Sequence, residues 1–415
     1  MAGMTIAEKI LARAAGQERV RPGEIVVCEV DVAVQLDMGF LGERPALRQV
    51  WDPSRVVVVA DHLAPAADPA SAEAHVRMRA FAEQFGLQHV YDVGRQGISH
   101  QLVAELGMAL PGTVLANSDS HTCAAGAFNC VARGLGAPEM LYVLATGRTW
   151  YLCGPTTRFV LSGELPPRVL PRDVVHYIAG AYGDFAGQNL EYVGPTVAAM
   201  SMAGRQTIAT MSAELSVEFA LFEADATTDA YLRARTDAPY TPVFADPDAE
   251  YAAVHHVDVS ALEPQVALPG RVPHNVAPVS AVAGTRIHQA FVGSCANGRL
   301  EDLAMAAEIV KGRKVHPNVR FLVTPSSQQQ LKEAVRLGIV ETLLEADAVV
   351  TNSTCGACFG GHMGVLGPNE VCLTASTRNF QGRMGHPSAQ IYLGSPATVA
   401  ASAIAGCIAD PRDLL

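Results

Sequence analysis

The chain has 415 residues, which is too long for one ordinary hydrophobic core and predicts two or three domains. Hydrophobic residues make up 49% and charged residues 17% of the chain, a balance that is typical of a well-buried globular protein and excludes a disordered one. The net charge of −11 argues against nucleic acid or an anionic membrane surface as the main partner, and no apolar run reaches the roughly 20 residues of a membrane helix.

The beginning of the chain has the pattern of an amphipathic helix. Thr5 and Glu8 have the spacing of a capping box, and Glu8 and Lys9 interrupt the apolar residues. This pattern argues against a signal peptide. The nine cysteines are scattered over the chain, which is not typical of a secreted disulfide framework, so we expect a cytoplasmic protein.

Short β-branched runs alternate with helical patterns along the chain, which predicts an α/β fold of layered sheets with helices outside. The expected strands cover residues 24–30, 55–61, 112–118, 288–294, 319–325 and 346–352. The expected helices include residues 70–86, 138–147, 300–312 and 326–337. We place domain boundaries near residues 150 and 280, which gives domains 1–150, 151–280 and 281–415. The stretch after residue 225 is polar and rich in Pro and Ala, and we expect it to be a linker region.

Three cysteines follow expected strands late in the chain. Cys355 and Cys358 come after residues 346–352 and, read alone, resemble a thioredoxin-like dithiol. Cys295 has the equivalent place after residues 288–294. Loops at the carboxyl ends of parallel strands converge, so three thiols on two such loops favour a metal centre. An iron–sulfur cluster with one iron open to substrate, a zinc site completed by His362, and three unrelated buried thiols all stay open at this point.

Short polar signatures lie at the ends of other expected elements. Taken singly, each has a structural explanation, because caps and satisfied histidines are common. Together with the three cysteines they indicate a catalytic site. They are Asp61, His62, His100, Asp119, Ser120, His121, Glu214, Arg378 and Arg383.

The motifs "GSCANGRLEDL", "CGACFGGHMGVL" and "RNFQGRMG", supported by "DSHT" and "AGRQTIATMSAE", resemble those of one family. From about residue 24 to the end, the chain is similar to the large subunit of the aconitase superfamily, in its isopropylmalate dehydratase and homoaconitase branch. The resemblance implies three α/β/α layered domains around a central 4Fe–4S cluster. It also implies that the fourth, swivel domain is absent from this chain and is supplied by a small subunit, in a heterodimer or heterotetramer.

The same resemblance implies a hydro-lyase. Such an enzyme removes water from a 2-substituted malate-type hydroxydicarboxylate and adds it back with the hydroxyl on the neighbouring carbon. Cys295, Cys355 and Cys358 would hold the cluster. Asp61–His62, His100–Asp119 and His121–Glu214 would be acid–base pairs, while Ser120, Arg378 and Arg383 would bind the substrate. The serine that takes the carbon-bound proton would lie on the swivel domain.

The chain departs from the family pattern near the expected site. Relatives usually have Asn where this chain has Thr210 and Thr377, His or Gln where it has Leu36 beside Asp37, and Thr where it has Ala296. These departures predict retained cluster chemistry with altered tuning. The leading substrate is 3-isopropylmalate of leucine biosynthesis, homoaconitate is second, and an aryl- or phosphorus-containing malate analogue is third.

Two functions of other classes remain as alternatives. The first is a cluster-free regulatory or RNA-binding relative, and the second is a redox dithiol on an unrelated α/β scaffold; a zinc hydrolase ranks below both. The remaining cysteines are expected to be small buried residues without a role: Cys28, Cys123, Cys130, Cys153, Cys372 and Cys407. His255 and His256 are expected to be solvated in the linker region.

Overall fold

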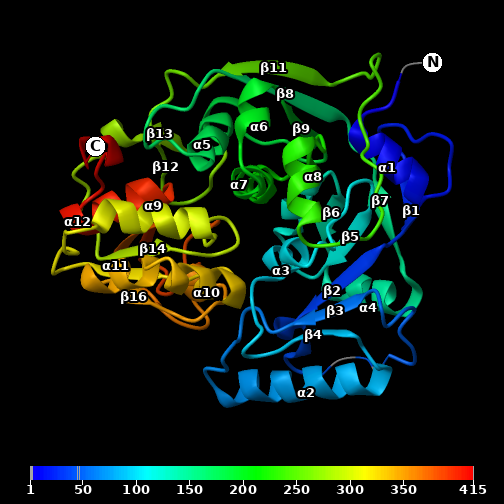
Figure 1. Ribbon diagram of the computed structural model, residues 1–415, viewed down its shortest axis with the longest axis horizontal. Coiled ribbons are helices and arrows are strands. Elements are labelled where there is room, and N and C mark those ends of the chain that lie inside the picture. The colour runs from blue at the N-terminus through cyan, green and yellow to red at the C-terminus, as the bar shows by residue number, and fades with distance from the viewer. Residues whose placement is uncertain (1–2, 44, 46, 415) are drawn as a thin grey trace. The chain divides into compact units, whose positions relative to one another are not determined.

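The computed structural model describes residues 3–43, 45 and 47–414, and Figure 1 labels its elements. Contacts divide the chain into two compact units, each assembled from separate segments. Unit 1 comprises the described residues up to Val93, Ser99–Gly163 and Phe185–Asp258. Unit 2 comprises Gly94–Ile98, Glu164–Asp184 and the described residues from Val259 onward. The division into three domains, with boundaries near residues 150 and 280, stays a prediction.

Within the described residues of unit 1, a five-stranded parallel sheet has the order β4-β3-β2-β5-β6. All four valines of β3 are buried, as expected of a strand that is covered on both faces. Because the strands are parallel, their carboxyl ends share one edge of the sheet. The strands are β2 (Val32–Leu36), β3 (Val56–Val59), β4 (His89–Tyr91), β5 (Val114–Asn117) and β6 (Val131–Gly134).

The helices expected at the beginning of the chain and at residues 70–86 and 138–147 are confirmed near this sheet, while the helix at residues 99–105 was not predicted. The capping box of Thr5 and Glu8 is confirmed at the start of α1. Asp68 accepts from the N–H of Ser71 at the start of α2, which ends at Gly86 with a left-handed φ of 62°. These helices are α1 (Ile6–Ala14), α2 (Pro69–Phe85), α3 (Ser99–Glu105) and α4 (Ala137–Thr146).

A second parallel sheet of unit 1 has the order β10-β9-β8-β11. Its strands are β8 (Thr156–Ser162), β9 (Asn189–Val193), β10 (Phe219–Phe222) and β11 (Ala253–Asp258). Its helices are α6 (Pro195–Ala199), α7 (Met202–Ser212) and α8 (Ala226–Arg233).

The expected linker after residue 225 is wrong over part of its length. Residues 226–233 form α8, and residues 253–258 form a strand that pairs in parallel with residues 157–162 of β8. The ring of His255 consequently packs against Phe159 with ring centroids 5.1 Å apart, whereas His256 is exposed as expected. Pairing with an existing sheet edge overrode the polar composition of this stretch.

The expected strand at residues 24–30 is confirmed as β1 (Ile25–Glu29), but it lies outside the parallel sheets. It pairs antiparallel with β7 (Arg148–Leu152), so the two form a separate ribbon. Successive side chains of a strand point to opposite faces, and here Val26 and Cys28 are buried while Ile25 and Val27 are exposed.

Unit 2 contains a seven-stranded sheet, within the residues described, in the order β13-β12-β18-β17-β14-β15-β16. The strands from β14 to β18 pair in parallel, and β12 pairs antiparallel with β13 and β18. The strands are β12 (Gln265–Ala267), β13 (Val276–Pro278), β14 (Gln289–Val292), β15 (Arg320–Val323), β16 (Val349–Val350), β17 (Val371–Thr374) and β18 (Gln390–Leu393). The helices are α5 (Pro171–Tyr182), α9 (Leu300–Val310), α10 (Gln328–Arg336), α11 (Ile339–Glu345) and α12 (Pro396–Ala405).

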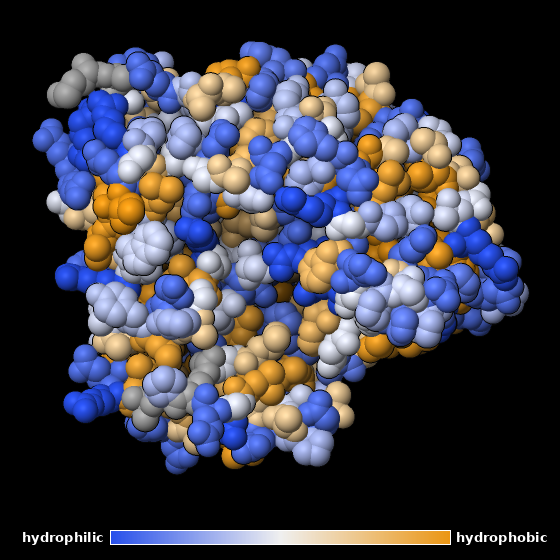
Figure 2. All heavy atoms as spheres, turned by 180° about the vertical axis from the view of Figure 1, so that it is seen from behind, coloured by the Kyte–Doolittle hydropathy of each residue, from blue (hydrophilic) through white to orange (hydrophobic). Residues whose placement is uncertain are grey.

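The predicted α/β class is therefore confirmed, with parallel sheets in both units. On the face drawn in Figure 2, hydrophilic residues are interspersed with hydrophobic ones. Among residues 3–43, 45 and 47–414, no helix combines the length and apolar character needed to cross a membrane.

Candidate active site

The carboxyl edge of the first sheet of unit 1 carries a group of buried acids and histidines. Asp61 and His62 follow β3, and Asp119 and His121 follow β5, so both loops leave the same edge of one parallel sheet. His100 belongs to α3, and Glu214 belongs to the short 3-10 helix η3 (Ala213–Leu215) directly after α7. All six predicted acid–base residues thus lie in unit 1.

Asp119 is the centre of this group. Its carboxylate lies 3.7 Å from Nε2 of His62, 3.8 Å from Nε2 of His100 and 3.6 Å from Nδ1 of His121. Burial by itself would raise the pKa of Asp119, but the charges and hydrogen bonds of the histidines outweigh burial and hold that pKa well below its usual range. The family resemblance predicts that Asp119 pairs with His100 alone. In the structure, the Asp119 carboxylate lies near the imidazoles of three histidines.

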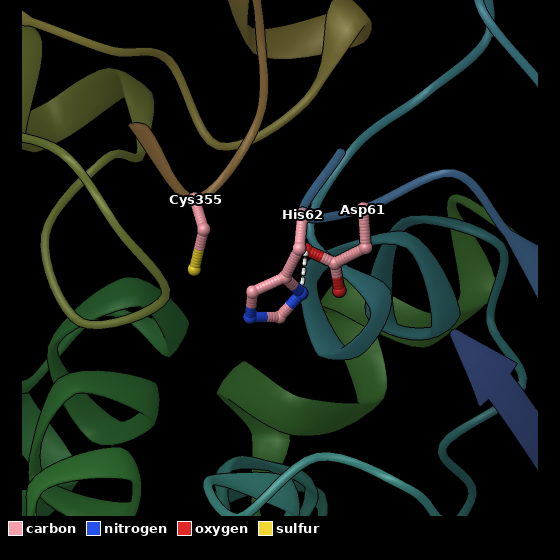
Figure 3. A group of neighbouring side chains, drawn as sticks. All are labelled: Asp61, His62 and Cys355. Atoms are coloured by element: carbon pink, nitrogen blue, oxygen red, sulfur yellow. Dashed lines mark ion pairs between the residues drawn. The ribbon is translucent and has the colours of Figure 1, made fainter. Parts of the chain in front are cut away.

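His62 is paired with the acid that precedes it in the chain. Nδ1 of His62 lies 3.3 Å from Oδ1 of Asp61, the contact that Figure 3 draws as a dashed line. Oδ2 of Asp61 accepts from the backbone N–H of Ser99, which fixes this carboxylate. Burial would lower the pKa of His62, but the charge of Asp61, together with those of Asp119 and Asp37, raises it to about 10. The ring is therefore cationic at neutral pH.

His121 bridges two acids. Its Nε2 lies 2.8 Å from Oε1 of Glu214, and its backbone N–H donates to Oδ1 of Asp119 at 2.7 Å. Burial would lower the pKa of His121, but hydrogen bonds to Asp119 and Glu214 raise it. The hydroxyl of Ser120 lies 3.3 Å from Nδ1 of His121. This arrangement can supply a protonated imidazole to a ligand.

Asp37 is a residue whose role the sequence did not reveal. It follows β2, and its carboxylate accepts from the backbone N–H groups of Asp61 (3.1 Å), His62 (3.1 Å) and Leu63 (2.9 Å). Nε2 of His75, from α2, lies 3.3 Å from the same carboxylate. Burial would raise the pKa of Asp37, but the hydrogen bond with His75 and the backbone donors lower it. Asp37 is completely buried and holds the loop that presents His62.

The family departures in unit 1 have local explanations. The hydroxyl of Thr210 donates to the carbonyl of Gln206 at 2.6 Å, so its proton is used within α7. The amide of Gln35 donates to the carbonyl of Leu36 and to the hydroxyl of Ser118. The sequence does not predict these hydrogen bonds, because each of them depends on the rotamer of a side chain.

The predicted cluster cysteines lie at the carboxyl edge of the sheet in unit 2. Cys295 follows β14 and precedes α9, while Cys355 (drawn in Figure 3) follows β16, and Cys358 lies in the 3-10 helix η5 (Gly356–Phe359). All three are buried, with exposed fractions of 3%, 4% and 1%. Gly356 has a φ of 64°, and a Cβ there would meet Oγ1 of Thr324 at 2.7 Å, so this tight turn requires glycine.

Arg383 lies beside the predicted cluster cysteines. Its Nη2 donates to Sγ of Cys358 at 3.4 Å. Burial would lower the pKa of Arg383, but the charges of Cys358, Cys355 and Cys295 raise it. Arg383 is thus a neighbour of the predicted cluster cysteines and contacts one of them directly. Because thiolates are the ligands that iron–sulfur clusters require, these residues fit such a group.

Of the other predicted residues of unit 2, Thr377 and Arg378 lie in the loop after β17. Oγ1 of Thr377 is 3.8 Å from Sγ of Cys358, and Arg378 is partly exposed. Ala296 is buried, and its carbonyl accepts from Nη1 of Arg299 at 2.7 Å. His362, the possible fourth zinc ligand, is also partly exposed.

The expected burial of the cysteines without an assigned role is confirmed for five of the six. All nine cysteines of the chain lie among the described residues, and none of them forms a disulfide. Cys407 is partly exposed and the other five are buried. Burial raises the pKa of Cys28, Cys123, Cys130 and Cys153 to about 12.

Comparison with known proteins identifies the family. The sequence model of the Aconitase family (aconitate hydratase) matches residues 34–285 and 274–406. The 3-isopropylmalate dehydratase large subunit of Mycolicibacterium smegmatis is 52% identical over 413 residues, which cover 100% of this chain and 98% of that protein.

Two archaeal proteins, both from Methanothermobacter thermautotrophicus, are also similar over nearly their whole length. A probable 3-isopropylmalate dehydratase large subunit is 44% identical and covers 99% of both chains. A probable methanogen homoaconitase large subunit is 43% identical and covers 99% of this chain and 98% of its own. An unrelated scaffold with a redox dithiol is thereby excluded. The chain belongs to the aconitase family and is a hydro-lyase.

Proposed function

We propose that this chain is the large subunit of a 3-isopropylmalate dehydratase, which isomerises its substrate by removing water and adding it back. The observation that carries the proposal is the 52% identity to a 3-isopropylmalate dehydratase large subunit over the full length of the chain. The chemistry of the predicted ligands also supports it, because Cys295, Cys355 and Cys358 are all buried and Cys358 accepts a hydrogen bond from Arg383.

We assign Cys295, Cys355 and Cys358 as the ligands of a 4Fe–4S cluster. Such a cluster, when three thiolates hold it, supplies an open iron that acts as a Lewis acid on a substrate hydroxyl and carboxylate. The three side chains are buried, which limits access of water and oxidants to the iron. Three thiolates are enough to hold the proposed 4Fe–4S cluster, whereas a structural zinc site would need His362 as its fourth ligand. We therefore favour an iron–sulfur cluster over zinc.

We assign His62 as the proton donor to the departing hydroxyl. The charges of Asp61 and Asp119 keep its pKa high, so the imidazolium is populated at neutral pH. Asp119 stays ionised and orients the rings of His62, His100 and His121. A carboxylate that holds an imidazolium in one orientation lowers the cost of proton transfer.

We assign Arg378, Arg383 and Ser120 to substrate binding. Guanidinium groups can bind carboxylates through two parallel hydrogen bonds, which suits a dicarboxylate. Arg383 donates to Cys358 with one nitrogen, while its Nε is buried and has no hydrogen-bond partner, so this group can still donate.

A small subunit is expected to complete the enzyme, because the similar proteins are called large subunits. Its swivel domain would supply the base that takes the carbon-bound proton. Homoaconitase is the second candidate function, and the 43% identity to a homoaconitase large subunit supports it.

The test is reconstitution of the enzyme under anaerobic conditions. The chain is loaded with iron and sulfide, combined with candidate small subunits, and assayed for the absorbance of the unsaturated intermediate from 3-isopropylmalate and then from homoaconitate. We expect turnover of 3-isopropylmalate. Cys295→Ser should lose both bound iron and turnover, whereas the matched variant Cys407→Ser should keep them.

Turnover of homoaconitate alone would move the assignment to the second candidate. If an aryl- or phosphorus-containing malate analogue is the only substrate, the chain is a specialised-pathway enzyme. A protein that binds no iron after loading would instead support the cluster-free regulatory alternative.

A further inference from the structure

Arg172, the second residue of α5, is a completely buried cation in unit 2. Its Nη1 donates to Oδ1 of Asn297 at 2.8 Å and to the carbonyl of Ala375 at 2.7 Å. Its Nη2 donates to the carbonyl of Ser376. All three acceptors are neutral.

No carboxylate among the described residues forms an ion pair with Arg172, and its buried Nε has no hydrogen-bond partner. The nearest acids are occupied elsewhere. Asp173 accepts from the backbone N–H groups of Leu170 and Gln265. Burial raises the pKa of Asp173 to about 7, so at neutral pH this residue is only partly charged.

Asp302, the second of these acids, is hydrogen-bonded to groups other than Arg172. It accepts from Nδ2 of Asn297 at 2.8 Å and from the backbone N–H of Arg299 at 3.0 Å. Burial raises the pKa of Asp302 to about 6, and the charge of Arg299 opposes that rise. A buried charge that forms no direct ion pair is costly, so the Arg172 guanidinium would be stabilised by a further anion bound near it.

The loops that hold Arg172 identify the anion, because Asn297 lies two residues after the proposed ligand Cys295 and Ser376 directly precedes Thr377, which lies near Cys358. Burial lowers the pKa of Arg172 to about 10, while the charges of Asp173, Asp302, Cys295 and Cys358 oppose that lowering. Two of these four groups are proposed cluster ligands. A cluster held by three thiolates carries net negative charge and would supply what the neutral acceptors do not.

The same guanidinium also joins the two loops that surround the cysteines. Asn297 is two residues after Cys295 in the chain. Ala375 and Ser376 directly precede Thr377, whose hydroxyl is 3.8 Å from Sγ of Cys358. One side chain thus fixes the loop of Cys295 and the loop after β17 through hydrogen bonds to both.

We propose that Arg172 is the buried counter-charge of the cluster and the positioning residue that joins the loop of Cys295 to the loop of residues 375–377. This inference rests on the proposed function, because it requires a cluster on the three cysteines. Arg172 touches no substrate in this proposal and acts through the cluster alone.

A fixed positive charge favours the reduced form of a neighbouring cluster, because reduction adds negative charge. Replacing Arg172 with a neutral residue should therefore shift the midpoint potential of the cluster to more negative values. Arg172→Lys keeps the charge but cannot reproduce the planar set of donors, so it should retain most of the potential while loosening the loops.

The experiment compares Arg172→Met and Arg172→Lys with the unmodified chain after anaerobic loading. Iron per protein and the midpoint potential are measured by an EPR-monitored redox titration. We expect a more negative potential in Arg172→Met, a smaller shift in Arg172→Lys and faster loss of iron in both. Arg205→Lys is the matched control, because Arg205 is also completely buried but pairs with Asp225 in unit 1.

Equal potentials in Arg172→Met and the unmodified chain would overturn the inference and leave the proposed function intact. Failure of the unmodified chain to bind a cluster would instead overturn the proposed function. If Arg172→Met takes up no iron, the iron content of Arg172→Lys decides between the outcomes. A higher iron content in Arg172→Lys than in Arg172→Met supports the role of Arg172 as a counter-charge. An equally low iron content in the two variants overturns that role.

Discussion

At the scale of single residues, one carboxylate lies at the centre of the candidate site in unit 1. Asp119 contacts His62, His100 and His121 at 3.6 to 3.8 Å, and the mutual attraction holds its own pKa low while it helps to raise that of His62. Asp119 therefore stays ionised and His62 stays protonated in the same neutral range. Proton donors that stay charged near a stable carboxylate suit the expulsion of hydroxide.

This charge pattern predicts how stability depends on pH. The pKa of His62 is about 10 in the folded chain, against about 6.5 for an unperturbed histidine. Its contribution to stability is thus complete below about pH 6.5 and is lost as the pH rises to about 10. We expect His62→Gln to make the alkaline fall of the urea unfolding midpoint shallower than in the unmodified chain.

The control is His256→Gln, which replaces an exposed histidine of β11 and should leave the alkaline fall unchanged. The measurement is the midpoint at intervals between pH 6 and pH 10. Parallel curves for His62→Gln and the unmodified chain would contradict the assigned protonation of His62.

At the scale of elements, the sequence predicted the strands that consist of apolar runs. Val56–Val59 is one example, because a central strand covered on both faces needs four buried residues in succession. The strand at Ala253–Asp258 was missed, since its residues become a strand only by pairing with β8. The strand β1 was predicted, but its antiparallel pairing with β7 in a separate ribbon was not. The sequence of one strand does not determine which other strand it pairs with.

The residues of the candidate site that belong to short sequence motifs could be predicted. The residues and contacts that depend on tertiary structure could not. The cysteines and the acid–base residues were found from short motifs and a family resemblance. The shared position of Asp119 depends on the convergence of separate segments, and nothing in any one of them indicates it. Arg172 was missed because it lies in an ordinary helix start, more than a hundred residues before Cys295.

The loop after β3 gives an element-scale prediction. Asp37→Asn replaces an acceptor of three backbone N–H groups with a side chain that presents its own donors to that loop. Because Asp37 positions His62 and does not bind substrate, kcat should fall by about 10- to 100-fold while KM changes little. Steady-state kinetics of the reconstituted enzyme measures this split.

Asp52→Asn is the matched control, since Asp52 also accepts from a backbone N–H in a turn but is partly exposed. Its kcat should stay within twofold of the unmodified enzyme, as is usual for surface substitutions that cost about 0.5 kcal/mol or less. A rise in KM for Asp37→Asn at constant kcat would show that the carboxylate binds substrate directly.

At the scale of the whole chain, the cysteines divide into two classes that follow from their surroundings. Cys295, Cys355 and Cys358 act on a guanidinium, whereas Cys28, Cys123, Cys130 and Cys153 lie in places where burial raises their pKa to about 12. A thiol with a high pKa is a poor nucleophile and a poor metal ligand at neutral pH. Cys28, Cys123, Cys130 and Cys153 are therefore poor candidates for chemistry at neutral pH.

This division predicts the order in which the thiols react. In native protein at about pH 8, an alkylating reagent should label Cys407, which is partly exposed, and leave Cys28, Cys123, Cys130 and Cys153 unmodified. Their labelling requires unfolding, because both the burial and the high pKa vanish only when the surrounding sheets separate. Mass spectrometry of the peptides, in native buffer and in increasing urea, measures the order; modification of Cys28 or Cys153 before the unfolding transition would contradict it.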